Sequence, residues 1–167
     1  MQPGDPTSNA PVVPWQRVPG GARWLGLAGL VPFLAGVVLT VNPPGPVPPG
    51  AIVQATLLYG AVILSFLGGI DWGAAMLRGE RATAPYLVAV IPSLVAWVTL
   101  LFVYPTHQAF VLALAFALKW LVDRFHLQVG RYPQAFMRLR TLLTIGAVAA
   151  LLVLGFLVLD FGPPPPR

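Results

Sequence analysis

The chain has 167 residues, of which 57% are hydrophobic and only 9% are charged, and its mean hydropathy is +0.78. A soluble domain carries about 25% charged residues, so this composition excludes a water-soluble globule and predicts an integral membrane protein. The net charge of +5 does not indicate nucleic-acid binding, because the cations flank apolar stretches rather than sharing a polar face. The absence of cysteine excludes disulfides and thiolate metal sites.

The first segment, residues 1–22, contains five prolines and cannot form a regular helix, so we expect a disordered cytoplasmic tail. The apolar stretch that begins at Trp24 is too long for a signal peptide and is expected to be a retained anchor. The membrane domain is predicted over 23–161, and residues 162–167 form a proline-rich stub.

Apolar stretches of about 20 residues, the length that crosses a bilayer, follow one another along the chain. They are expected at 24–41, 51–71, 85–104, 108–123 and 141–160, with a tight turn at Pro105-Thr106-His107. Each of Pro32 and Pro92 removes a backbone hydrogen bond inside its span and predicts a kink. The predicted fold is therefore all-α, a polytopic bundle of five transmembrane helices.

The charge pattern sets the predicted orientation of this bundle. With the N-terminus inside and the C-terminus outside, nine of the ten lysines and arginines are cytoplasmic and only Arg167 is external, as the positive-inside rule requires. Lys119 interrupts the fourth span but lies near its end, where the ammonium group can snorkel to the headgroups. We expect a multi-pass protein of the bacterial cytoplasmic (inner) membrane, with its basic segments on the anionic inner leaflet.

Small residues recur at every fourth position of the second span, at Ala61, Ser65, Gly69 and Gly73. Residues four apart lie on one helix face, so they predict a shallow groove that lets a second helix approach closely. This stripe is the best-specified interaction feature of the sequence, and we expect it to make the second span the central helix of the bundle.

The same span carries a family resemblance. Residues 59–61, 65–69 and 72–73 resemble the signature of a family of small membrane proteins, domain of unknown function 3429. Weaker points of similarity are Pro92 with Trp97, Asp123-Arg124, and the run 137–144 that enters the last span. The resemblance covers about 24–158. It implies a multi-pass architecture and brings no activity with it.

Acidic residues near the membrane are candidate working groups. Asp71, at the inner end of the second span, could relay protons or bind a cation. The simpler interpretation, which we favour, is an interfacial ion pair with Arg78 or Arg81, or with an arginine of 124–140.

The basic stretch 124–140 alternates cations with apolar residues and has two interpretations. It could lie on the inner leaflet as an interfacial helix, or it could be an ordinary positively charged loop. The cations expected to contact anionic lipid are Arg124, Arg131, Arg138 and Arg140.

No catalytic triad, phosphate-binding loop or paired histidines occur in the sequence, so we predict no catalytic, cofactor or metal site and no enzyme activity. The favoured function is a non-catalytic accessory or assembly subunit that packs against a copy of itself or a larger membrane complex. The alternative is a carrier or receptor for a lipophilic molecule such as a quinone, sterol or tetrapyrrole. A cavity shared by Pro32, Pro92 and Trp97 would favour the carrier, and a filled core would favour the subunit.

Overall fold

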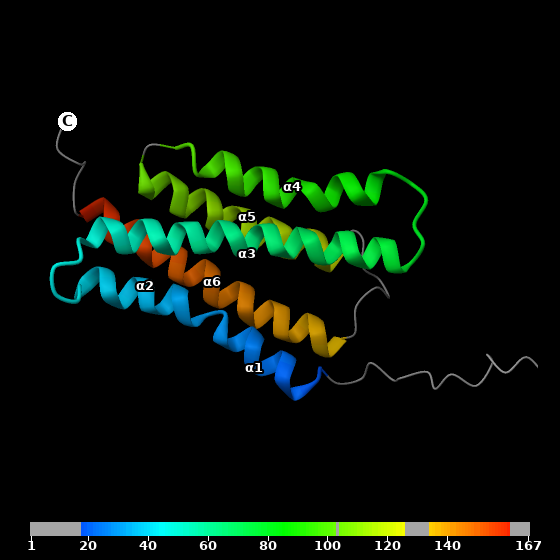
Figure 1. Ribbon diagram of the computed structural model, residues 1–167, viewed down its shortest axis with the longest axis horizontal. Coiled ribbons are helices and arrows are strands. Elements are labelled where there is room, and N and C mark those ends of the chain that lie inside the picture. Colours follow the sequence, from blue (N-terminus) through cyan, green and yellow to red (C-terminus); the bar gives the residue numbers. More distant parts are fainter. Residues whose placement is uncertain (1–17, 103, 126–133, 161–167) are drawn as a thin grey trace, which may run out of the picture.

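The computed structural model describes residues 18–102, 104–125 and 134–160, and within these ranges every regular element is a helix. Figure 1 shows long helices that run back and forth along one axis, so that α1 begins at one end of the bundle and α6 ends at the other. The helices are α1 (Gly20–Ala28), α2 (Val31–Val41), α3 (Pro49–Leu77), α4 (Ala84–Thr99), α5 (Pro105–Phe125) and α6 (Gln134–Asp160).

Within the described residues, four segments are long and apolar enough to cross a membrane: α1 and α2 together, α3, α5 and α6. The remaining apolar helix, α4, has 16 residues and is the short member of the set. The predicted all-α membrane fold is confirmed, although which end of the bundle faces the cytoplasm stays a prediction.

Helix boundaries differ from the predicted spans. α3 continues past Asp71 to Leu77, because one charged residue does not interrupt the backbone hydrogen-bond ladder, and α6 begins at Gln134, within the polar stretch that precedes the predicted span. The turn expected at Pro105 is wrong, since α5 begins at this residue. Proline suits a first helical position, where its missing N–H would have no partner.

The first span bends at Gly29 and Leu30, between α1 and α2, and Pro32 occupies the first turn of α2. The kink expected from Pro32 is therefore present. The bend leaves the Gly29 carbonyl without a helical donor, and the hydroxyl of Tyr59 on α3 donates to it at 2.9 Å. A tyrosine of a neighbouring helix thus satisfies the backbone group that the bend exposes.

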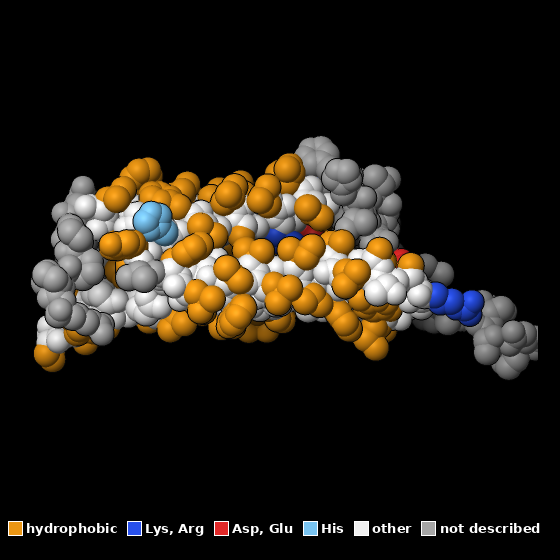
Figure 2. Space-filling view, turned by 90° about the horizontal axis from the view of Figure 1, so that it is seen from above, with side chains coloured by type: hydrophobic (Ala, Val, Ile, Leu, Met, Phe, Trp, Pro, Cys, Tyr) orange, Lys and Arg blue, Asp and Glu red, His pale blue; other side chains and the backbone are white. Residues whose placement is uncertain are grey.

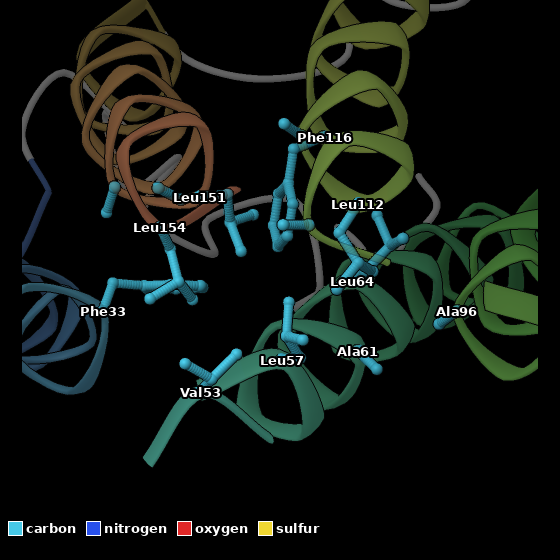
Figure 3. Close-up of a cluster of buried hydrophobic side chains, with 14 residues drawn as sticks. Phe33, Val53, Leu57, Ala61, Leu64, Ala96, Leu112, Phe116, Leu151 and Leu154 are labelled. Carbon is cyan, nitrogen blue, oxygen red and sulfur yellow. The ribbon is translucent and has the colours of Figure 1, made fainter. Parts of the chain in front are cut away.

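The interior is filled by side chains from α2, α3, α5 and α6. Figure 3 shows them pointing toward one another from these helices, with Ala96 of α4 at the edge of the cluster. The largest fully buried apolar side chains are Phe33, Leu57, Leu64, Leu112, Leu151 and Leu154. Figure 2 shows hydrophobic side chains along the whole length of one outer face. Such a surface suits a lipid environment.

Close backbone approaches occur at glycines that the stripe does not include. A Cβ built on Gly68 would overlap the carbonyl oxygen of Ala89 on α4, and it would lie 3.5 Å from Cβ of Pro92. A Cβ on Gly36 of α2 would overlap the side chain of Thr56 on α3. These two glycines therefore let α4 and α2 pack tightly against α3.

The prediction that Ala61, Ser65, Gly69 and Gly73 form one packed groove is wrong within this chain. Ala61 is buried and Ser65 is partly buried, but a Cβ on Gly69 or Gly73 would meet no described atom within 4 Å. With 3.6 residues per turn, a four-residue repeat advances by about 40° a step. From Ala61 to Gly73 the stripe therefore turns by about 120° and leaves the packed face.

Candidate functional site

Four charged side chains meet inside the bundle and form what we term the buried charge network: Asp71 of α3, Lys119 and Asp123 of α5, and Arg140 of α6. The Lys119 ammonium donates to Oδ2 of Asp71 at 2.6 Å and to Oδ1 of Asp123. The Arg140 guanidinium forms an ion pair with Oδ2 of Asp123. Two acidic and two basic groups give a net charge of zero for the part of the network that the structure describes.

The network is shielded from solvent to different degrees. The side chains of Asp123, Arg140, Lys119 and Asp71 are 1%, 5%, 7% and 17% exposed. An isolated charge in such surroundings costs several kcal/mol, and pairing offsets that cost only where the partner is held in place. Asp123 is the centre of the network, because each of its oxygens meets a different cation.

The helices bring these groups to one depth. Asp71 lies six residues before the end of α3, Lys119 six before the end of α5, and Arg140 six after the start of α6. At 1.5 Å per residue, each is about 9 Å from its helix end. Because α3 and α5 end where α6 begins, the three positions coincide.

Sequence spacing explains why they point inward. The packed face of α3 follows steps of four and three residues through Leu57, Ala61, Leu64 and Gly68 to Ala75, and Asp71 completes that spacing. On α5, Lys119 and Asp123 continue the spacing of the buried Leu112 and Phe116. A continuous 4-3 seam is the pattern of helix packing, so charges placed on it face a neighbouring helix.

Two predictions about these residues need correction. Lys119 does not snorkel outward, because it lies on the packed seam beside two carboxylates. Asp71 was expected to pair with Arg78, Arg81 or an arginine of 124–140; among the described residues it forms an ion pair with Lys119, a partner that was not predicted. Arg78 instead meets Glu80, with 3.7 Å between Nε and Oε1, and Arg81 is exposed.

The arginines predicted to contact lipid differ in where the structure places them. Arg140 is buried in the network and is not at the surface, so its assignment to lipid is wrong. Arg124 and Arg138 are exposed near the ends of α5 and α6, whereas Arg131 lies outside the described residues. The described parts of 124–140 belong to α5 and α6 themselves and not to a separate interfacial helix.

An apolar crevice with a volume of about 180 Å³ adjoins the network. It lies where α1 bends into α2, and Arg140 and Thr144 of α6 provide its polar side chains. Its lining residues are Leu25, Gly26, Gly29, Leu30, Phe33, Ile63, Phe66, Leu67, Phe116, Arg140, Leu143, Thr144 and Ala147. The buried Nε of Arg140 has no hydrogen-bond partner among the described residues.

Hydrogen bonds next to the network join α5 to α6. The indole N–H of Trp120 donates to the Thr141 hydroxyl at 3.0 Å, and that hydroxyl donates to the Met137 carbonyl at 2.8 Å. Thr141 thus bonds its own helix, as threonines near a helix start often do. Among the described residues, no group of three or more histidine, aspartate or glutamate side chains is placed to hold a metal ion.

A lipid-compatible exterior and a neutral charge network between helices define a multi-pass helical membrane protein. Over residues 18–156 the chain matches the family described as "Protein of unknown function (DUF3429)", and it belongs to that family. The resemblance seen in the sequence is thereby confirmed.

Two relatives share the name Transmembrane protein 69. The protein of Xenopus tropicalis is 37% identical over 139 residues, which cover 80% of this chain and 53% of that protein. The protein of Mus musculus is 32% identical over 138 residues, covering 81% and 55%. The chain thus spans about half the length of these relatives. No solved structure matches it.

Proposed function

We propose that this protein is a non-catalytic accessory or assembly subunit that associates with a copy of itself or a larger membrane complex through the outward face of α3. The observation that carries the proposal is the open space at Gly69 and Gly73, where an added Cβ would meet no described atom. Small residues on a lipid-facing surface let a second helix approach closely, and packing of this kind drives association of helices in a bilayer.

The filled interior supports a subunit over a carrier with a large central chamber. Pro32, Pro92 and Trp97 do not surround a common cavity. Pro32 is exposed, Pro92 is buried against α3, and Trp97 is 61% exposed on the outside of α4. The interior positions that a large ligand would need are occupied by packed leucine and phenylalanine side chains.

We place the protein in the bacterial cytoplasmic membrane with its N-terminus inside. The described lysines and arginines support this orientation, because all of them lie toward the end of the bundle where α1 begins. Retention of basic residues on the cytoplasmic side is the strongest determinant of orientation in helical membrane proteins.

Leucine substitutions on α3 test the association. Gly69→Leu and Gly73→Leu add bulk where the chain has room, so the thermal stability of the purified protein should be unchanged while association decreases. Val153→Leu, at an exposed position of α6 and away from the proposed interface, is the matched control. Association is measured in native membranes by co-purification of two differently tagged copies and by quantitative mass spectrometry of co-purifying subunits. Unchanged association in both glycine variants would refute the proposed interface.

A further inference from the structure

The crevice beside Arg140 has the features of a ligand site. Figure 3 shows Phe33 of α2 and Phe116 of α5 pointing into the space between their helices, and their ring centroids lie 6.1 Å apart at 85°. Both rings line the crevice, and Phe66 of α3 is a third phenylalanine in its wall. A flat apolar group placed here would meet aromatic rings from three helices.

The crevice opens toward lipid. Its lining residues Leu25 and Phe66 are 77% and 62% exposed on the apolar exterior of the bundle. A molecule dissolved in the bilayer can therefore reach the crevice without crossing water. Bends in a membrane helix leave such openings, and this one lies at the bend between α1 and α2.

Arg140 supplies the polar end of the crevice. Its ion pair with Asp123 fixes the guanidinium, yet the buried Nε–H donor has no acceptor among the described residues. A buried donor without a partner costs about 1–3 kcal/mol, more where the group is charged. An acceptor oxygen in the crevice would remove that cost.

We propose that the crevice binds the head group of a lipid-soluble molecule of the quinone class: a single six-membered ring whose carbonyl oxygen accepts from Arg140. The proposal goes beyond the association described above and does not depend on it. The hydrophobic tail of the molecule lies toward the opening at Leu25 and Phe66.

The charge balance of the network favours a ligand with a neutral head group. Among the described residues, the network already balances two acidic against two basic side chains, so an anionic head would add a negative charge in apolar surroundings. A carbonyl oxygen accepts a hydrogen bond and adds no charge.

The volume of the crevice favours a head group with a single ring. A dry protein cavity of about 150 Å³ holds benzene, so about 180 Å³ holds one substituted ring. A tetrapyrrole or the whole ring system of a sterol exceeds that volume.

The test uses the full-length protein in detergent micelles and a benzoquinone that carries one isoprene unit. Binding is measured by quenching of tryptophan fluorescence and by equilibrium dialysis. The paired probe, prenylbenzene, matches the ring and tail and lacks the carbonyls, so it should bind at least tenfold more weakly, the loss expected for a hydrogen bond to a charged group. Equal affinity for the two probes would refute the role of Arg140.

Variants locate the site. Leu67→Trp fills the crevice from α3 and keeps all four charged side chains of the network, and it should abolish quinone binding. Leu94→Trp, on the exposed face of α4, is the control and should bind normally. Retained binding in a folded Leu67→Trp protein would place the probe elsewhere and overturn the proposal.

A photoreactive azidoquinone provides a readout that needs no variant. The wild-type protein should be labelled on peptides of α3 and α6 that line the crevice. Labelling confined to α4, or none that unlabelled quinone competes away, would overturn the proposal. Competition by anionic phospholipid but not by quinone would identify a lipid headgroup as the occupant and would equally refute the quinone assignment.

Discussion

Replacing Asp123 with asparagine tests how the bundle tolerates its buried charges. The substitution keeps the size of the side chain, so no cavity forms, but it leaves Lys119 and Arg140 opposite a single carboxylate, Asp71. Asp123 is 1% exposed and meets both cations. Breaking a buried ion pair from one side costs about 3–5 kcal/mol, since the remaining charge is stranded, and we expect Asp123→Asn to lower the free energy of unfolding by that amount.

Asp71→Asn is the matched comparison. Asp71 meets one cation of the network, Lys119, at 2.6 Å, and its side chain is 17% exposed. Water can therefore reach it in part, and Lys119 keeps its second partner, Asp123. The expected loss is about 1.5–3 kcal/mol at most, the scale of one hydrogen bond to a charged group.

Both variants can be measured by reversible unfolding in mixed micelles of mild detergent and sodium dodecyl sulfate, followed by far-ultraviolet circular dichroism. The informative result is which of the two variants loses more free energy of unfolding. A smaller loss for Asp123→Asn than for Asp71→Asn would show that burial and the number of ion pairs do not govern the energetics of this network. An unchanged Asp123→Asn protein would refute the reasoning altogether.

Three further predictions follow from the packing and the charges. Tyr59→Phe removes the donor to the partly buried Gly29 carbonyl and should lower stability by about 0.5–1.5 kcal/mol, the net contribution of one hydrogen bond; an unchanged unfolding curve would refute a stabilising role for this bond. Gly68→Ala forces α3 against the Ala89 carbonyl and should destabilise by about 1–3 kcal/mol, whereas Gly69→Ala, with open space around it, should not; equal effects would contradict this packing. Reporter fusions should place the N-terminus in the cytoplasm and the C-terminus outside, and signals from one side only would refute that topology.

Composition and periodicity predicted the class of fold because they indicate whether the chain is surrounded by water or by lipid. Long apolar stretches have to cross lipid, and Pro32 marks a bend because its ring removes a helical hydrogen bond. The end of α3 and the start of α6 were missed because the spans were ended at charged residues, Asp71 and Arg140, while backbone hydrogen bonding continues past them.

The charge network was missed because each charge was judged by its distance from a helix end. A lysine near a boundary can snorkel, and this general rule was applied to Lys119. The signal that would have found the network is the 4-3 spacing, which places Asp71 on the seam of α3 and places Lys119 and Asp123 on the seam of α5. The partner on α6, Arg140, needs the tertiary arrangement, because the α5–α6 connection includes residues outside the described ranges.

Seams of leucine and alanine alone leave the axial position of a helix weakly specified, since a shift of one turn puts similar side chains into similar holes. The charge network removes that freedom, because a one-turn shift of α5 by about 5.4 Å would separate Lys119 from Asp71 and Asp123 from Arg140 at once. The same fixed register keeps Phe116 and Arg140 in the lining of one crevice. A register set by paired charges therefore gives this small bundle both a unique packing and a defined polar end to its crevice.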